Sequence, residues 1–227
     1  ANQFSTEILT VDIGIDSDIY CSNIINKKIA YGTRSIVKGP AMDPSQARKA
    51  ISNGIEIVYD LCRNGTNIII TGELGIGNTT TSAAIASLIL GIPAEITTGR
   101  GAGLDSSGMS RKIAAIHRAI KLNKPDPTDP IDVLSKLGGF DIAGMTGLFL
   151  GGAECGIPIV IDGVISAVSA CLAEMISPGC RDFMLPSHVS NEPSARLLLE
   201  KLGLKAPINA GFPVSYTHLR AHETKAN

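Results

Sequence analysis

Apolar and polar positions along this chain repeat with two different periods. After Asp43 and Pro44, apolar residues recur every three or four positions, which predicts an amphipathic helix that ends at Asn64 and Gly65. Short continuous apolar runs, each followed by a turn, predict buried strands. We expect strands at residues 8–13, 68–70, 94–97, 157–161 and 183–185, and helices at about 44–63, 79–90, 106–122, 131–137, 141–154, 164–176 and 192–202.

This alternation of strands and helices is typical of a doubly wound, Rossmann-like α/β fold, in which a parallel sheet carries helices on both faces. Ligands of such sheets bind at the carboxyl ends of the strands. The expected strand ends lead into turns at residues 71–79, 98–103, 162–163 and 186–188, so we expect the functional site there. The glycines between residues 138 and 147 are expected to let helices pack closely.

We interpret residues 1–211 as one domain, an incomplete α/β core, and residues 212–227 as a non-native tail. The tail has neither a helix nor a strand period, and its run Ser-Tyr-Thr-His-Leu-Arg-Ala-His-Glu-Thr resembles translated adapter sequence. His218 and His222 have the spacing of paired metal ligands, but in such a tail we expect no native metal site.

The composition disfavours several classes of protein. The chain has 227 residues, a formal net charge of −1 and 44% hydrophobic residues. These values suit one domain with a substantial core and predict neither a nucleic-acid-binding nor a membrane-directed surface. The five scattered cysteines include no Cys-x-x-Cys pair, which favours buried free thiols over disulfides or a zinc site. Without a long apolar run or a signal-peptide pattern, we expect a cytoplasmic protein.

The turn after the strand at 68–70 is the most informative segment. It contains Gly72, Gly75 and Gly77 and leads into a threonine-rich helix start. The backbone N–H groups of such a turn, with the positive end of the helix dipole, favour a bound anion such as phosphate. Glu73 lies in the middle of it, where a carboxylate beside a phosphate needs an explanation. The alternative is a tight strand-to-helix connection in which Glu73 caps backbone amides.

Two familiar nucleotide-binding motifs do not fit this turn. Gly72 and Gly77 have the spacing of a P-loop, but Asn78 stands where the phosphate-binding lysine belongs. The dinucleotide motif fails because Thr80 replaces its third glycine, and the acidic residue expected about 20 positions later could only be Glu95. The turn therefore indicates neither a triphosphate nor a dinucleotide site.

Five motifs occur in order: Gly72-Glu-Leu-Gly-Ile-Gly-Asn-Thr-Thr80; Gly99-Arg-Gly-Ala-Gly-Leu-Asp105 with Lys112; Asp132-Val-Leu-Ser-Lys-Leu-Gly-Gly-Phe-Asp-Ile-Ala-Gly-Met-Thr-Gly147; Ile161-Asp-Gly163; and Leu185-Pro-Ser-His188. Together they resemble the nicotinate-nucleotide–dimethylbenzimidazole phosphoribosyltransferase family over about residues 8–205. The resemblance implies transfer of the 5-phosphoribosyl group from nicotinate mononucleotide to 5,6-dimethylbenzimidazole. The products are α-ribazole 5′-phosphate and nicotinate, in cobalamin nucleotide-loop assembly. The resemblance also implies a homodimer and a reaction that uses no cofactor.

The residues agree with this chemistry. A monophosphate can be held by turn amides and one lysine, so no Mg²⁺ is needed to manage a pyrophosphate. The chain also lacks the strand-end acidic pair and threonine-rich loop of diphosphate-donor phosphoribosyltransferases. Gly101, Ala102 and Lys112 are the phosphate candidates. Lys112 owes this assignment to its match with the family's lysine after this turn, since alone it would be interpreted as a solvated helix lysine.

The resemblance implies further site residues. The acceptor must lose a proton as it attacks C1′, which calls for a carboxylate base. The family's principal base glutamate lies in a glycine-rich segment near the C-terminus that is absent here, and its N-terminal part and small second domain are largely missing. Glu73 matches a second family glutamate and is expected to assist. Substrate contacts are expected from Gly75, Asn78, Thr79, Asp162 and Ser187.

Alternatives stay open at several positions. Asp162 could instead cap the next helix, Ser187 could cap a turn, and His188 is interpreted as structural. For the whole protein, the alternative is a non-catalytic nucleotide-binding or activator-type member of the same fold. The 227-residue chain by itself is expected to be inactive or nearly so, because it lacks the principal base.

Overall fold

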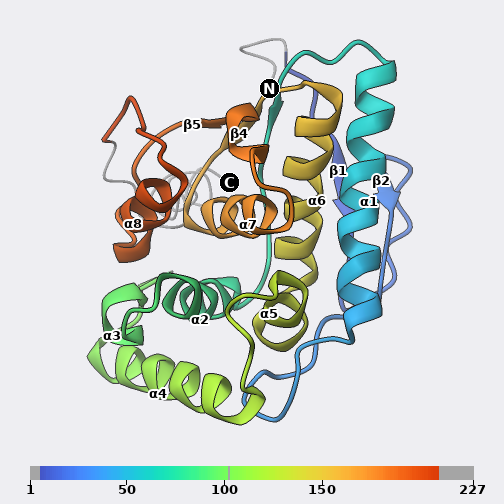
Figure 1. Cartoon of the computed structure of the whole chain (residues 1–227). Coiled ribbons are helices and arrows are strands. Elements are labelled where there is room, and N and C mark those ends of the chain that lie inside the picture. Colours follow the sequence, from blue (N-terminus) through green and yellow to red (C-terminus); the bar gives the residue numbers. More distant parts are fainter. Residues whose placement is uncertain (1–5, 102, 210–227) are drawn as a thin grey trace, which may run out of the picture.

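The structure, a computed structural model, describes residues 6–101 and 103–209. Its elements follow one another largely as the hydrophobic pattern predicts (Figure 1). In order they are β1 (Thr10–Asp12), β2 (Ile24–Asn26), α1 (Pro44–Arg63), β3 (Ile69–Ile70), α2 (Asn78–Leu90), α3 (Ala94–Thr97), α4 (Ser106–Asn123), α5 (Pro130–Leu137), α6 (Phe140–Cys155), β4 (Ile159–Ile161), α7 (Val164–Ile176), the 3-10 helix η2 (Cys180–Phe183), β5 (Met184–Pro186) and α8 (Pro193–Leu202). The interpretation of residues 212–227 as a tail, with its two histidines, falls outside the described residues.

The described strands all pair in parallel. β3, β4 and β5 form one sheet in that order, with Ile69 beside Ile159 and Val160 beside Leu185. The predicted α/β fold with parallel strands is therefore confirmed. One detail is corrected, because β1 pairs with β2 in a separate two-stranded sheet and does not join the main one. The pattern does not predict β2, since its three partly exposed residues are too few to show a period.

Residues 94–97 form the helix α3, so the prediction of a strand there is wrong. Pro93 precedes the helix, and its restricted φ suits a helix start. The hydroxyl of Thr97 is buried and donates to Ala83 O in α2 (3.1 Å). Four residues are too few to distinguish the two periods, and packing against α2 and α4 favours the helix. The turn at 98–103 therefore follows a helix and not a strand.

Helix α6 lies at the centre of the fold between α1 and α7 (Figure 1). Its contact with α1 is close because glycines replace side chains on both helices. A Cβ built on Gly147 would lie 2.0 Å from Ile51 O, and one on Gly54 would lie 2.1 Å from Gly144 O. The close helix packing predicted for the glycines of this segment is confirmed at Gly144 and Gly147.

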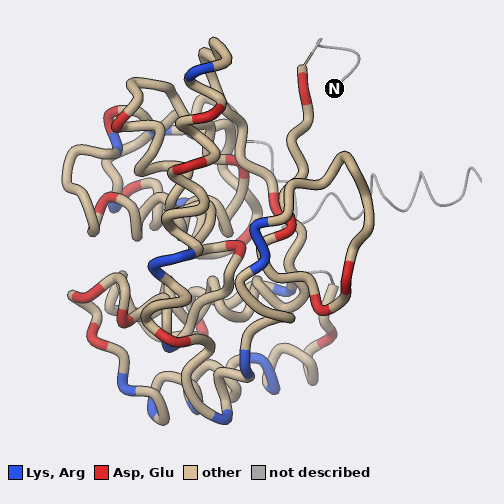
Figure 2. Tube along the Cα trace, turned by 90° about the vertical axis from the view of Figure 1, so that its right-hand side faces the viewer, with Lys and Arg blue, Asp and Glu red and all other residues tan. Residues whose placement is uncertain are grey.

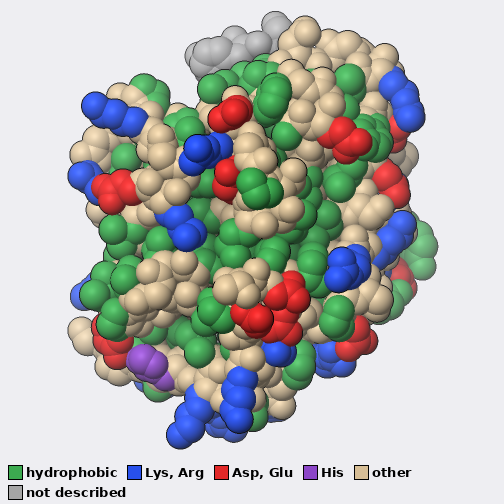
Figure 3. All heavy atoms as spheres, in the orientation of Figure 1, with side chains coloured by type: hydrophobic (Ala, Val, Ile, Leu, Met, Phe, Trp, Pro, Cys, Tyr) green, Lys and Arg blue, Asp and Glu red, His purple; other side chains and the backbone are tan. Residues whose placement is uncertain are grey.

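Basic and acidic positions are interspersed along the described part of the chain (Figure 2). Hydrophobic side chains lie open across the middle of the face shown in Figure 3. Among residues 6–101 and 103–209, no helix is both long and apolar enough to cross a membrane. The cysteines are free, as predicted, although only Cys171 and Cys180 are buried.

Replacing Gly147 with alanine is expected to lower the free energy of unfolding by about 2–3 kcal/mol, because α1 and α6 must separate to admit a methyl group. Gly39→Ala is the matched control, since nothing lies within 4 Å of a Cβ at Gly39. Its effect should stay within about 0.5 kcal/mol. Urea unfolding followed by circular dichroism measures both variants, and equal stabilities would contradict the close contact.

Candidate active site

The junction between β3 and α2 brings together most of the predicted site residues. Gly77 has a left-handed backbone (φ 81°), and α2 begins at the next residue, Asn78. The strand, turn and helix predicted here are confirmed. Asn78 and Thr79 are consecutive, yet they contact different groups of charged side chains. We name these groups the carboxylate cluster (Glu73, Asn78, Asp141) and the lysine cradle (Thr79, Gly99, Gly101, Lys112, Glu192).

In the carboxylate cluster, the side-chain amide of Asn78 lies between two acids. Its Nδ2 donates to Asp141 Oδ2 (2.9 Å) and to Glu73 Oε2. Glu73 Oε2 also accepts from Gly75 N (3.2 Å), so the capping role considered as an alternative is present. A Cβ at Gly75 would lie 2.2 Å from Asp141 Oδ2, which leaves room for glycine alone. The structure thus brings Glu73, Gly75 and Asn78 together as one polar network.

Asp141 is a residue of this network that the sequence interpretation missed. It lies in the first turn of α6, directly after the Gly138-Gly139-Phe140 part of the third motif. An acidic residue at the start of a helix is commonly explained by the helix dipole alone. Its membership in the recognised motif is the signal that could have indicated a second role.

Burial raises the pKa of Glu73 above its usual value, and the Asp141 and Asp162 carboxylates raise this pKa further, while the hydrogen bond from Asn78 opposes the shift. Glu73 as a residue is exposed, but its carboxylate is turned toward the protein and makes the contacts described above. A carboxylate with a raised pKa is a better proton acceptor near neutral pH. Asp162, at the end of β4, is close enough to influence it.

Lys112, on α4, is the cation of the lysine cradle. It is 7% exposed and is therefore not the solvated helix lysine of the alternative interpretation. Its Nζ donates to Thr79 Oγ1 (3.0 Å) and to Gly99 O (3.0 Å). Within the described ranges these two oxygens are its hydrogen-bond acceptors, which leaves a third N–H for a ligand. Burial lowers the pKa of Lys112, and the nearby Glu192 carboxylate opposes this shift.

Gly101 lies beside the lysine, as predicted. Its backbone is left-handed (φ 54°), and a Cβ there would lie 3.0 Å from Thr79 Oγ1 and 3.5 Å from Lys112 Nζ. The Gly101 N–H donates to Glu192 Oε1 (3.2 Å), so it already faces an anion. Glu192 is the second residue that sequence interpretation missed, because an acid before a proline at a helix start suggests only an N-cap. Ala102, the third phosphate candidate, lies outside the described residues.

Ser187 joins the ends of β4 and β5. Its N–H donates to Ile161 O (3.0 Å), and its Oγ lies 2.8 Å from the same oxygen and 2.9 Å from His188 Nδ1. These contacts agree with the alternative interpretation of Ser187 as a cap and with a structural role for His188. Substrate contacts of Ser187 and Asp162 stay predictions.

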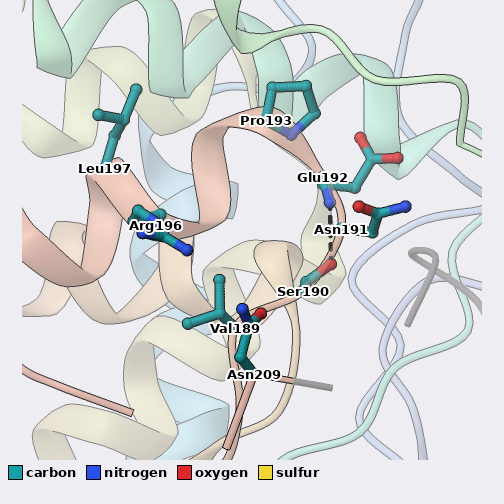
Figure 4. A pocket seen from close by; sticks show the side chains of 8 residues that line it. All are labelled: Val189, Ser190, Asn191, Glu192, Pro193, Arg196, Leu197 and Asn209. Carbon is teal, nitrogen blue, oxygen red and sulfur yellow. Dashed lines mark hydrogen bonds between the residues drawn. The ribbon is translucent and has the colours of Figure 1, made fainter. Parts of the chain in front are cut away.

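A surface hollow of about 410 Å³ lies on the outer side of the segment that carries Glu192. It is lined by Val189, Ser190, Asn191, Glu192, Pro193, Arg196, Leu197 and Asn209. Figure 4 shows the Glu192 side chain projecting away from Arg196, which agrees with its bond to Gly101. Glu192 therefore both lines this hollow and accepts, through its carboxylate, a hydrogen bond from the loop that carries Gly101.

Residues 1–215 match the family described as phosphoribosyltransferase (DBI_PRT). The chain belongs to this family. A relative from Acetivibrio thermocellus, named nicotinate-nucleotide–dimethylbenzimidazole phosphoribosyltransferase, is 48% identical over 209 residues, which cover 92% of this chain and 60% of the relative. The relative of the same name from Ruminiclostridium cellulolyticum is 52% identical over 198 residues, covering 87% and 56%. The resemblance inferred from the five motifs is confirmed.

A solved structure supports the same membership of the phosphoribosyltransferase family. The crystal structure of the Thermus thermophilus enzyme of that name has a TM-score of 0.83 and 32% identity, and the likeness covers 89% of this chain and 60% of that one. This chain therefore spans 56–60% of the length of the two curated relatives.

Glu73→Gln is expected to make this family member more stable at neutral pH. A carboxyl group with a raised folded-state pKa binds its proton more tightly in the folded protein, so its contribution to stability is present at low pH. That contribution is complete below the unfolded-state value of 4.5 and is lost as pH rises through the raised folded-state pKa. Glutamine does not ionise and should add about 0.5 kcal/mol or less at about pH 7, because exposed charges are screened.

Urea unfolding at about pH 4 and about pH 7 measures this difference. The gain in the free energy of unfolding from Glu73→Gln should be small at about pH 4 and larger at about pH 7. Glu200→Gln, at an exposed position of α8, is the control and should show no such change. A gain that is equal at both pH values would contradict the raised pKa of Glu73.

Proposed function

We propose that the full-length protein transfers the phosphoribosyl group of nicotinate mononucleotide to 5,6-dimethylbenzimidazole and releases nicotinate. The two curated relatives carry this name, and the chain spans 56–60% of their length. The observation that best supports the proposal is the buried Lys112, whose Nζ lies beside Gly101 and bonds Thr79 at the start of α2. The next residue toward the N-terminus, Asn78, belongs to the carboxylate cluster. A cation and an acid thus flank one helix start.

The lysine cradle is the proposed phosphate site. Lys112 keeps one N–H for an acceptor, and the Gly101 N–H is already oriented toward a carboxylate oxygen. The start of α2 at Asn78 adds the positive end of a helix dipole. One lysine with backbone amides suits a monophosphate, whereas the transfer of a triphosphate's γ-phosphoryl group depends on Mg²⁺.

The carboxylate cluster is the proposed acid–base side of the site. One ring nitrogen of dimethylbenzimidazole attacks C1′ on the face opposite the pyridinium. The bond from C1′ to the pyridinium nitrogen breaks, nicotinate leaves with the electron pair, and β configuration becomes α. The second ring nitrogen loses its proton to a carboxylate. Glu73, whose pKa burial raises, is suited to assist in this step or to orient the acceptor. The principal base is the glutamate that the family resemblance places in a segment absent from this chain.

The other predicted residues have supporting roles in this proposal. Asn78 holds Glu73, and Asp141 holds Asn78, so both act as positioning residues. Gly75 leaves space for the Asp141 carboxylate. Asp162 and Ser187, at adjacent strand ends, are proposed to contact the ribose or the phosphate. A homodimer is part of the proposal as well.

The decisive experiment is the reaction itself. Full-length protein incubated with nicotinate mononucleotide and dimethylbenzimidazole, without added metal, should form nicotinate and α-ribazole 5′-phosphate in equal amounts, measured by liquid chromatography. Omission of dimethylbenzimidazole is the control and should abolish the second product. A folded full-length protein that binds the nucleotide but forms neither product would contradict the proposal and favour the activator-type alternative.

Lys112→Met should raise the KM for nicotinate mononucleotide about 10- to 100-fold, because a charge-assisted bond to the phosphate is lost. Steady-state kinetics of the full-length protein measure this effect. Lys121→Met, at an exposed position of the same helix, is the matched control and should leave KM unchanged. An unchanged KM for Lys112→Met would exclude the lysine cradle as the phosphate site.

A further inference from the structure

Glu192 is a partly buried carboxylate that the proposed reaction does not use. It occupies the N-cap position of α8, but its side chain does not cap that helix. It reaches across to the loop at residues 99–101, where Oε1 accepts from Gly101 N (3.2 Å). The approach is close, since a Cβ at Gly99 would lie 2.0 Å from Glu192 Oε2. The carboxylate therefore ends inside the lysine cradle, and the same residue also lines the hollow shown in Figure 4.

The carboxylate of Glu192 interacts with the same two groups that are proposed to bind the phosphate. Its hydrogen-bond donor is the Gly101 N–H, which is also a proposed phosphate donor. Its charge acts on Lys112, the proposed phosphate cation, and favours the protonated lysine against the effect of burial. The Gly101 N–H and Lys112 cannot both bind Glu192 and a phosphate at full strength. A carboxylate close to a phosphate dianion is also repelled.

We infer that Glu192 is a displaceable internal anion: its carboxylate accepts from the Gly101 N–H in the lysine cradle and must leave when the phosphate of the substrate binds. This inference rests on the proposed phosphate site. It adds that Glu192 lowers the affinity of that site for phosphate. Leaving costs the bond to Gly101, so Glu192 weakens the binding of every phosphate ligand. Ligands that lack a phosphate do not compete with Glu192, so Glu192 does not change their affinity. The carboxylate therefore sets the affinity of the lysine cradle for phosphate ligands alone.

The N-cap position gives Glu192 a second favourable place. The positive end of the α8 dipole attracts a carboxylate, and a rotation of the side chain would turn it from the loop toward its own helix. The inference therefore assigns the displaced side chain to the start of α8, in place of the Gly101 N–H to which it is bonded here.

Isothermal titration of the chain with inorganic phosphate tests this inference. Glu192→Ala removes the competing acceptor and should bind phosphate about three- to tenfold more tightly than the unchanged chain, which is the fold-change for one typical hydrogen bond. Glu192→Gln keeps an acceptor and loses only the negative charge, so it should also bind phosphate more tightly, with a smaller gain. Nicotinate mononucleotide should show the same gain. Nicotinate riboside, the same compound without its phosphate, should bind equally well to all of these proteins.

Glu200→Gln makes the same chemical change on the outside of α8 and should leave phosphate binding unchanged. Circular dichroism confirms that each variant is folded, and the glutamine variant keeps an acceptor for the Gly101 N–H. If neither Glu192 variant binds phosphate more tightly, or if riboside binding rises as well, the inference is overturned. Lys112→Met separates it from the proposed function. Loss of phosphate binding in that variant without a gain in the Glu192 variants rejects the Glu192 inference alone, whereas unchanged binding in Lys112→Met rejects the phosphate site and the inference with it.

Discussion

The start of α2 is the constraint on which the site depends. Because the helix begins directly after the left-handed Gly77, two consecutive side chains leave it in different directions. Asn78 bonds Glu73 and Asp141, while Thr79 accepts from the buried lysine. A helix that began one residue earlier or later would lose both sets of contacts. One backbone turn therefore sets the position of the acidic half of the site relative to the basic half.

The charges are divided between these two halves. Glu73 lies near the Asp141 and Asp162 carboxylates, and Lys112 lies on the other side of the helix start. The proposed donor would place its cationic pyridinium toward the acidic half and its anionic phosphate toward the basic half. A buried lysine needs a counter-charge, because burial disfavours its protonated form. Glu192 supplies that counter-charge from a distant segment.

The acidic half depends on backbone contacts elsewhere in the fold. Asp141 lies in the first turn of α6, two residues after Gly139, where a Cβ would approach Asp141 Oδ1 to 2.4 Å. Further along, the same helix touches α1 through Gly147. Contacts between backbones leave less freedom than contacts between long side chains. The carboxylate is therefore held by a helix that has little room to shift.

The sequence by itself determined the order of the elements, the parallel α/β class, the family, and the turn with Glu73 and Asn78, because periodicity and glycine turns are local properties. Tertiary structure alone decided that residues 94–97 are helical and that Lys112 is buried. It also added two acids, since Asp141 meets Asn78 across 63 positions and Glu192 meets Gly101 across 91. The physical reason is that such contacts follow from how helices pack against one another, which the period of a single segment does not specify.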